Sequence, residues 1–255
     1  FPVNMRWGAQ SLKFIRPIRW LVALYGEEVI PFEIAGVKSG NRSKGHRFLG
    51  EEVEIASADQ YVSALEEQFV YVDIKQRKRM ITEQIESMAK QNNWHIAVNE
   101  ELLEEVVFLV EYPTVLSGSF HEEFLEIPQE VLITSMREHQ RYFPVFNESG
   151  ELLPHFVTVR NGNADFIENV KRGNEKVLRA RLSDARFFYK EDLSLPIPEA
   201  LQKLEKVVYH EELGTIAEKV ARITDIAGEL AGMLQVSADE QAKVKRAAEI
   251  CKFDL

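Results

Sequence analysis

The feature that most constrains the fold of this chain is an amphipathic helix predicted over residues 173–189. Apolar side chains recur there at spacings of three or four, which places them along one side of the helix: Leu178, Leu182, Ala185, Phe188 and Tyr189. An apolar stripe of this kind packs against the hydrophobic core of a domain. The remaining sides of the helix are left for polar and charged residues.

The polar sides of this helix carry an excess of positive charge. Residues 171–190 hold seven Lys or Arg against two acids, although the net charge of the whole chain is −10. We interpret this excess as a surface for an anionic partner, with RNA phosphate as the first candidate. The alternative is that the arginines pair with nearby Glu and Asp and fasten the helix to its own domain. The candidate RNA contacts in this helix are Lys171, Arg172, Lys176, Arg179 and Arg181.

The first fifty residues form a second basic segment. They carry eight Lys or Arg against three acids, whereas residues 51–130 carry five against eighteen. This separation of charge indicates that one face of the protein binds a polyanion and that the acidic face points away from it. Residues 41–47 are polar and include Gly45, so we expect an exposed loop that either contacts phosphates or is simply solvated. The candidate RNA contacts in this segment are Arg6, Arg16, Arg19, Arg42, Lys44, His46 and Arg47.

The composition is that of a globular protein with a sizeable core. The 255 residues are 45% hydrophobic and 28% charged, which suits one large domain or two ordinary ones. The longest apolar run, residues 20–25, is far too short to cross a bilayer, so we expect no membrane contact. The single Cys251 excludes an internal disulfide framework and a multi-cysteine zinc cluster. It also fits the reducing cytoplasm, where we expect the protein to act.

The hydrophobic pattern predicts an α+β fold in two domains. Strands are expected over residues 20–25, 29–37, 69–74, 142–146 and 156–159, and helices over residues 57–68, 75–91, 100–111 and 128–139. Turns at residues 26–28 and 147–150 predict hairpins between the strands on either side, and a capping box at Ser57 is expected to begin the first helix. The run Leu195-Pro196-Ile197-Pro198 marks the boundary between a first domain, residues 1–194, and a second, residues 195–255. The second is predicted to be all helical. Apolar residues repeat at a four-three spacing from Ile216 to Leu234, and a capping box at Ser237 begins a helix that runs to the end of the chain.

Six segments of the chain resemble the beta subunit of bacterial glycyl-tRNA synthetase, the alpha2-beta2 type, and they occur in the expected order. The segments are Phe1-Pro2-x-x-Met5-Arg6-Trp7, Phe14-Ile15-Arg16-Pro17-Ile18-Arg19-Trp20, Gly45-His46-Arg47-Phe48, Ser135-Met136-Arg137-Glu138-His139-Gln140-Arg141-Tyr142-Phe143, Gly173-Asn174-Glu175-Lys176-Val177-Leu178-Arg179-Ala180-Arg181-Leu182 with Asp184-Ala185-x-Phe187-Phe188, and Glu212-Leu213-Gly214-Thr215. Each segment alone is weak, whereas six in register over nearly the whole chain are highly specific.

This resemblance implies a subunit of glycine–tRNA ligase, an aminoacyl-tRNA synthetase. The alpha subunit is then expected to activate glycine with ATP and Mg²⁺, while the beta subunit binds tRNA(Gly) within an alpha2-beta2 heterotetramer. The chain is expected to be an N-terminal to middle fragment that lacks the active site and holds no cofactor. The resemblance also implies that the first domain is similar to the B3/B4 editing-like module of phenylalanyl-tRNA synthetase. The second domain would be the start of a truncated HD-type domain.

The cluster Arg137, His139 and Arg141 has two interpretations. It supplies three further RNA contacts and support for the fold, or it lines an editing pocket that hydrolyses mischarged tRNA. We favour the first, because glycine is the smallest amino acid and a glycine pocket excludes larger competitors by steric clash. Tyr142 and Phe143, which follow the cluster, are expected in the core.

A metal-dependent HD-type phosphohydrolase is a further alternative. Such enzymes need a His, an adjacent His-Asp pair and a later Asp, but here Asp254 follows Phe253, and an aromatic ring cannot ligate a metal. His210 is left as a surface or helix-start residue, and no two histidines have the i, i+4 spacing of a helical zinc site. We therefore predict no metal site. A purely structural role in subunit assembly stays open beside RNA binding.

Overall fold

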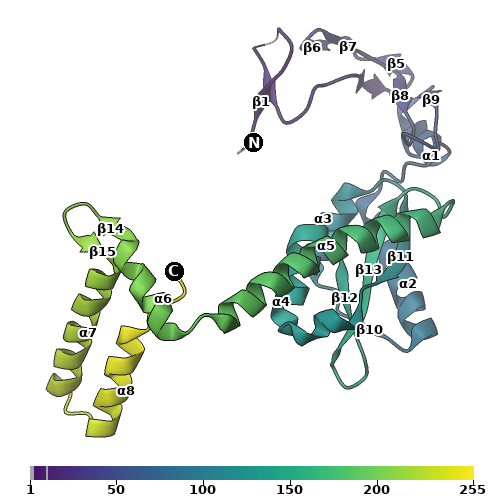
Figure 1. Cartoon of the computed structure of the whole chain (residues 1–255). Coiled ribbons are helices and arrows are strands. Elements are labelled where there is room, and N and C mark those ends of the chain that lie inside the picture. Colours follow the sequence, from purple (N-terminus) through teal and green to yellow (C-terminus); the bar gives the residue numbers. More distant parts are fainter. Residues whose placement is uncertain (1–2, 10) are drawn as a thin grey trace. The chain divides into compact units, whose positions relative to one another are not determined.

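The structure, a computed structural model, describes residues 3–9 and 11–255. Phe1 and Pro2, which begin the first of the six segments, lie outside the described residues, as does Gln10. The fold is mixed α+β, as predicted, and the chain divides into two compact units, Phe1–Asp184 and Ala185–Leu255 (Figure 1). Within the described part of the chain, no helix is both long enough and apolar enough to span a membrane.

The first unit is built on a four-stranded antiparallel sheet. Its strands are β10 (His95–Ile96), β11 (Pro113–Ser119), β12 (Phe143–Phe146) and β13 (Leu152–Asn161), in the order β10-β12-β13-β11. β12 and β13 form the predicted hairpin, whose turn is closed by a hydrogen bond of 3.0 Å from the Asn147 N–H to the Glu151 carbonyl. All seven residues of β11 pair with β13, so these two strands form the longest ladder of the sheet.

Two helices cover one face of this sheet. They are α2 (Ile74–Asn92) and α3 (Glu100–Leu109), and both lie close to their predicted ranges. Ile81, Ile85 and Val107 are at most 2% exposed, and they pack with Phe143 and Val157 of the sheet. Because successive strand residues point to opposite faces, this face takes alternate apolar residues and forms the larger core.

The opposite face of the sheet is crossed by α5 (Ile167–Ser194), the predicted basic helix (Figure 1). Leu178 and Leu182 are fully buried, which confirms the centre of the predicted apolar stripe, whereas Phe188 is 63% exposed. The segment between β11 and β12 consists of η2 (Glu122–Glu126), α4 (Gln129–Thr134) and a π-helical turn, Ser135–His139. The helix predicted over residues 128–139 is thus confirmed, with a change of helical type in its last turn.

The chain before α1 forms short strands that pair locally. They are β1 (Met5–Arg6), β2 (Lys13–Phe14), β3 (Leu21–Val22), β4 (Leu24–Tyr25), β5 (Glu28–Val29), β6 (Glu33–Ile34), β7 (Val37–Gly40), β8 (Arg42–Lys44) and β9 (Glu52–Glu54). Antiparallel pairs join β1 to β2, β4 to β5, β6 to β7 and β8 to β9, while β3 runs parallel to β7. η1 (Ala58–Gln60) and α1 (Tyr61–Glu66) follow, which confirms the first predicted helix.

The continuous strand predicted over residues 29–37 is wrong, because the chain turns within it. Pro31 has no N–H to donate to a sheet. Ala35 and Gly36 have φ of 54° and 79°, and positive φ at two successive residues makes the type I′ turn that folds β6 back on β7. The hairpin predicted at Gly26 is confirmed between β4 and β5.

Two expectations on either side of α1 are also wrong. Residues 69–74 do not form a strand, since Phe69 has φ of 60° and Asp73 caps α2 by accepting a hydrogen bond of 2.8 Å from the Lys75 N–H. The aromatic and β-branched residues of this run therefore connect two helices. The capping box predicted at Ser57 does not form, because the Ser57 hydroxyl donates to the Asp59 carboxylate instead.

The second unit combines helices with a short hairpin, so the prediction of an all-helical segment is wrong. Its elements are α6 (Ile197–Lys203), η4 (Leu204–Lys206), β14 (Val208–His210), β15 (Gly214–Thr215), α7 (Ile216–Met233) and α8 (Ala238–Glu249). β14 pairs with β15, and Gly214 supplies the positive φ of 84° that brings the chain back to α7. The Lys219 ammonium on α7 lies 3.6 Å from the centre of the Tyr209 ring, a cation–π contact that holds the hairpin against the helix.

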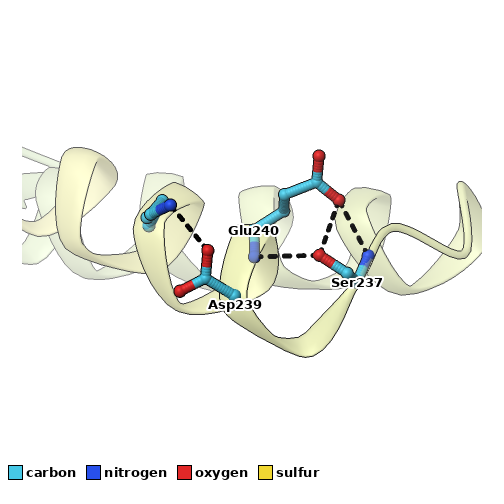
Figure 2. A network of polar contacts seen from close by, with 4 residues as sticks. Ser237, Asp239 and Glu240 are labelled. Atoms are coloured by element: carbon cyan, nitrogen blue, oxygen red, sulfur yellow. Dashed lines mark hydrogen bonds and ion pairs between the residues drawn. The ribbon is translucent and has the colours of Figure 1, made fainter.

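α7 and α8 both begin with a capping box. At α8 the predicted box is confirmed: the Ser237 hydroxyl accepts from the Glu240 N–H at 3.3 Å, and the Glu240 carboxylate accepts from the Ser237 N–H at 2.9 Å (Figure 2). α8 ends at Glu249 and does not continue to the end of the chain as predicted. Ile216 and Val220 begin the apolar repeat of α7 and are buried, which confirms that part of the pattern.

Gly118 of β11 lies directly against the ring of Phe156, its partner in the sheet. A Cβ atom added at Gly118 would stand 2.4 Å from Phe156 Cζ, and the ring is also held by stacking on Tyr142 at a centroid distance of 4.5 Å. We therefore expect Gly118→Ala to lower the free energy of unfolding by about 1–3 kcal/mol, measured by urea denaturation of the chain.

The matched control is Gly173→Ala on the exposed side of α5, where an added Cβ meets no atom within 4 Å. Alanine favours a helix over glycine, so this variant is expected to be more stable by up to about 1 kcal/mol. Equal unfolding midpoints for Gly118→Ala and the wild-type chain would rule out the tight contact with Phe156.

Candidate nucleic-acid interface

Five of the predicted RNA contacts line one groove in the first unit. They are Arg16, Arg19, Lys44, His46 and Arg47. The groove has a volume of about 1090 Å³ and is formed where the segment between β2 and β3 meets the segment between β8 and β9. Its lining also includes the indole of Trp20 and three carboxylates, Glu51, Glu52 and Glu111. The structure thus brings together residues from two motifs that lie more than twenty positions apart in the sequence.

The loop that carries His46 and Arg47 is closed tightly against Gln68, just beyond α1. The Gln68 backbone carbonyl accepts from the His46 N–H, and its side-chain carbonyl accepts from the Glu51 N–H, both at 2.8 Å. A Cβ atom at Gly45 would lie 2.5 Å from Gln68 Cβ, and one at Gly50 would lie 2.4 Å from the Gln68 carbonyl oxygen. Only glycine fits at either end, so residues 45–50 form a fixed loop.

This fixed loop corrects part of the prediction for residues 41–47. The expected exposed loop begins as a strand, β8, and two of its residues are buried: Ser43 is 7% exposed and His46 is 2% exposed. The His46 ring accepts a hydrogen bond of 3.3 Å at Nδ1 from the Phe48 N–H. Lys44 and Arg47 remain exposed, so the loop turns its cations outward while it holds the imidazole inside.

Two of the exposed cations lie over aromatic rings. Lys44 Nζ is 5.8 Å from the centre of the Trp20 ring, and Arg47 Cζ is 5.6 Å from the centre of the Phe48 ring, which is 82% exposed. These cation–π contacts orient the charged groups without neutralising them. Exposed rings beside cations are also the surfaces on which unpaired bases stack.

Arg42 and Arg6 lie outside the lining of the groove. Arg42 is paired with Glu52 at 3.6 Å and Glu54 at 3.2 Å on the exposed surface of the β8–β9 ribbon. Such surface pairs contribute little to the free energy of folding, about 0–1 kcal/mol, but they provide carboxylate partners for part of the Arg42 guanidinium. Arg6 is exposed at the end of β1.

Polar side chains in the middle of α5 fasten the helix to the sheet. That contact is made by Asn174, which accepts from the Tyr142 hydroxyl at 2.8 Å, and by Glu175, which accepts from the Ser119 N–H at 2.9 Å. Among the residues described, none forms an ion pair with the exposed Lys176, Arg179 or Arg181.

Lys171 and Arg172 lie in the same helix. Lys171 is half-buried, whereas the exposed Arg172 donates from Nε to the Glu168 carbonyl at 3.4 Å and bonds to the Asn169 side-chain oxygen. Neither contact neutralises the guanidinium charge. Lys176, Arg179 and Arg181 therefore face solvent, where they are available to a partner of opposite charge.

The cluster at residues 137–141 is divided by the π-helical turn. Arg137 lines a separate cavity of about 540 Å³ beside His95 and Asn99, and its Nε is buried with no hydrogen-bond partner among the described atoms. Arg141 instead donates from Nε to Glu105 at 2.5 Å, in a backbone conformation with φ of 60°. His139 is exposed. The three side chains therefore do not share one set of partners.

Tyr142 is buried between the sheet and α5, as predicted, and Phe143 is fully buried beside it. Tyr142 is 3% exposed, its ring stacks on Phe156, and its hydroxyl donates to Asn174. Burial raises the pKa of the Tyr142 hydroxyl to about 12, because the charged phenolate loses its hydration there. This residue seats α5 on the sheet and presents no group to a substrate.

Among the described residues, no group of three or more His, Cys, Asp or Glu side chains is arranged to hold a metal ion. His210 is exposed in β14, where its Nδ1 accepts from the Glu212 N–H at 3.2 Å.

A family model described as the glycyl-tRNA synthetase beta subunit matches residues 1–255, the whole of the chain. The chain belongs to this family. Curated relatives named glycine–tRNA ligase beta subunit include those of Bacillus subtilis strain 168 at 61% identity, Listeria monocytogenes serotype 4a at 56% and Shouchella clausii at 54%. Each is matched over 100% of this chain, which spans 37–38% of the length of these relatives.

The sequence alone did not predict that two residues, Gln68 and Trp20, shape the groove. Gln68 was assigned only to the end of a helix, and Trp20 to a strand, although Gln68 anchors the loop and Trp20 lies beneath the Lys44 ammonium. The paired glycines at 45 and 50 were the available signal, because two glycines that bracket a polar loop often mark a close backbone approach.

Because burial raises the pKa of Tyr142, the free energy of unfolding of this chain is expected to decrease at alkaline pH. The unfolded phenol ionises near its ordinary pKa of 10.0, whereas the folded one stays protonated to about 12. The unfolded state then binds fewer protons, so the free energy of unfolding falls as the pH rises from 10 to about 12. We expect Tyr142→Phe to show a shallower decline in urea denaturation across this range. Tyr25→Phe, at an exposed tyrosine, should decline like the wild type, and equal slopes in all three would contradict the burial effect.

Closure of the loop on Gln68 predicts a position-specific effect of glycine replacement. Gly50→Ala forces the loop away from Gln68, so the amide protons of residues 45–51 are expected to exchange with solvent about tenfold faster or more. Hydrogen exchange followed by mass spectrometry measures this. Gly40→Ala is the control, since its added Cβ meets no atom within 4 Å. Unchanged exchange in Gly50→Ala would show that the loop does not depend on this approach.

Proposed function

We propose that this chain is the part of a glycine–tRNA ligase beta subunit that binds tRNA(Gly), through the groove at residues 16–52 and the cationic side of α5. The observation that carries the proposal is the gathering of Arg16, Arg19, Lys44 and Arg47 around one groove in a chain whose net charge is −10. Cations concentrated in this way within an acidic protein indicate a local partner of opposite charge. A family of tRNA ligase subunits makes that partner a tRNA.

The chemistry of the groove suits structured RNA. Arg and Lys contact phosphate oxygens and release the counterions condensed on them, which gives affinity without sequence readout. The exposed ring of Phe48 and the indole of Trp20 offer stacking surfaces to unpaired bases. The carboxylates of the lining can accept from ribose hydroxyl and base amino groups. Together these groups can contact the phosphates, riboses and bases of an RNA chain, whereas a small inorganic anion would be contacted by the cations alone.

We assign the chemical step to another chain of the assembly. On this proposal the alpha subunit activates glycine with ATP and Mg²⁺ in an alpha2-beta2 heterotetramer of the cytoplasm, and residues 1–255 contribute tRNA binding without a cofactor of their own. The first unit, a sheet covered by helices on both faces, is assigned to an editing-like module of the B3/B4 kind. The second, with its paired helices α7 and α8, is assigned to the start of an HD-type domain. We assign hydrolysis to neither, for the steric reason that applies to glycine.

The proposal predicts how salt controls tRNA binding. In the full-length beta subunit, Arg19→Gln with Arg47→Gln should flatten the slope of log affinity against log salt by about 0.7–0.9 for each arginine that contacts a phosphate. Fluorescence anisotropy with labelled tRNA(Gly) at several salt concentrations measures this slope. The control pair is Arg79→Gln with Arg246→Gln, which removes equal charge from surface ion pairs outside the groove. The proposal fails when both pairs change the slope equally or neither changes it.

A further inference from the structure

A second hollow in the first unit adjoins the groove. Its volume is about 400 Å³, which lies within the range of small-ligand pockets. Trp20 and Leu21 line both hollows, so the two meet at these residues. We call the second hollow the Trp20 pocket, and its lining consists of Trp20, Leu21, Val22, Leu24, Ser43, Ala58 and Tyr61.

Backbone hydrogen bonds hold the walls of the Trp20 pocket. Part of the lining comes from β3 and β4, and between these strands the Ala23 N–H donates to the Gly40 carbonyl at 3.2 Å. Another part comes from η1 and the first residue of α1, where the Ala58 N–H donates to the Gly26 carbonyl at 2.8 Å. This second bond fastens η1 to the turn between β4 and β5. The fold therefore forms the pocket without a ligand, as it does most ligand sites.

The Trp20 pocket is open to solvent. Trp20 is 44% exposed, and Tyr61 is half-buried, so both side chains have surface that a partner can contact. Leu21, Val22 and Leu24 are also half-buried. Removing this apolar surface from water is favourable, which gives the pocket a driving force for binding.

The described residues that line the Trp20 pocket are all uncharged. Their polar side-chain groups are the indole N–H of Trp20 and the hydroxyls of Ser43 and Tyr61. A charged group would lose hydration there without gaining a partner of opposite sign, so the pocket selects a neutral group. The two aromatic side chains favour a flat group that stacks, and the neutral polar groups can bond to atoms on its edge.

The groove beside the pocket is charged, and its lining has four Lys or Arg against three Glu. Lys44 places one of these cations at the boundary, since its Nζ lies 5.8 Å from the centre of the Trp20 ring. A ligand that fills both hollows has a flat neutral part joined to an anionic part. An unpaired nucleotide has this composition, because its base is uncharged and its phosphate is not. An apolar side chain of a protein partner would fill the pocket but leave the adjacent cation without a partner.

We propose that the Trp20 pocket binds one unpaired base of the tRNA, which contacts the rings of Trp20 and Tyr61 while Lys44 contacts its phosphate. This inference rests on the proposed function and adds a base-binding subsite to a groove that holds the RNA backbone. Recognition in this region then depends on an unstacked nucleotide, the form in which proteins most often read RNA bases.

Filling the pocket tests the proposal without removing a group from it. Ala58→Leu enlarges an exposed residue of the lining, and Ala56→Leu makes the same change at an exposed residue outside the lining. We expect Ala58→Leu to weaken binding of tRNA(Gly) to the full-length beta subunit about tenfold or more, as loss of one stacked base does. Ala56→Leu should bind like the wild type. Fluorescence anisotropy with labelled tRNA(Gly) measures both affinities, and an equal effect of the two variants overturns the proposal.

Salt dependence separates the base contact from the phosphate contacts. Ala58→Leu should keep the wild-type slope of log affinity against log salt, because a neutral base releases no counterions. A flatter slope would assign its effect to the phosphate contacts and overturn the base subsite. If the arginine pair tested under the proposed function changes the slope and Ala58→Leu leaves the affinity unchanged, only the base subsite is wrong. If neither affects binding, the tRNA site itself is wrong.

Two short probes test for the base itself. An oligouridylate and an abasic ribose–phosphate chain of the same length carry the same phosphates, so the difference in their affinities reports contacts to bases. We expect the oligouridylate to bind the wild-type beta subunit more tightly and to lose most of this advantage in Ala58→Leu. Equal affinities of the two probes for the wild type would overturn the proposal.

Replacement of Tyr61 keeps the test decisive if Ala58→Leu does not fold, as judged by circular dichroism. Tyr61→Phe keeps the aromatic ring and Tyr61→Leu removes it, so we expect the leucine variant to bind tRNA(Gly) more weakly than the phenylalanine variant. Unchanged tRNA binding with weaker association of the alpha subunit, measured by sedimentation, would assign the pocket to a protein side chain and overturn the proposal.

Discussion

The close approach of residues 45–50 to Gln68 is the contact from which the candidate interface is built. Gln68 follows the last turn of α1, where backbone carbonyls have no partner within the helix, and the His46 N–H takes one of them. The absence of a Cβ at Gly45 and Gly50 lets two stretches of backbone come within van der Waals distance. The exposure of Arg47 and the burial of His46 both follow from that closure.

A different set of contacts leaves Lys176, Arg179 and Arg181 of α5 exposed. The helix is held to the sheet by apolar Leu178 and Leu182 and by hydrogen bonds to Asn174 and Glu175, and these contacts do not use the three cations. Tyr142 carries this attachment into the core through its stack on Phe156. An arginine used for internal pairing would be neutralised by its carboxylate. Here the apolar stripe and two polar side chains fasten the middle of the helix, and Lys176, Arg179 and Arg181 stay open to solvent.

Local patterns in the sequence were predictable, and contacts between distant segments were not. The stripe at Leu178 and Leu182, the box at Ser237 and the turn after β12 depend on residues within a few positions of one another. The strand predicted over residues 69–74 failed because its β-propensity was outweighed by the Asp73 cap of α2. Burial of His46 depends on Gln68, twenty-two positions later, and no periodicity reports such a contact. The cations of the groove were found by composition, but their gathering required the fold.

The two candidate surfaces differ in the kind of recognition that they offer. Exposed cations on α5 act through solvent, so their attraction is weakened by salt within about 10 Å and depends little on the direction of the partner. The groove adds two cations that aromatic rings orient, since Lys44 lies over Trp20 and Arg47 over Phe48. An acidic chain repels RNA at long range unless charge is concentrated locally. On the proposed function, α5 then contributes mainly to attraction, whereas the groove, whose loop is closed on Gln68, sets the position of the RNA backbone.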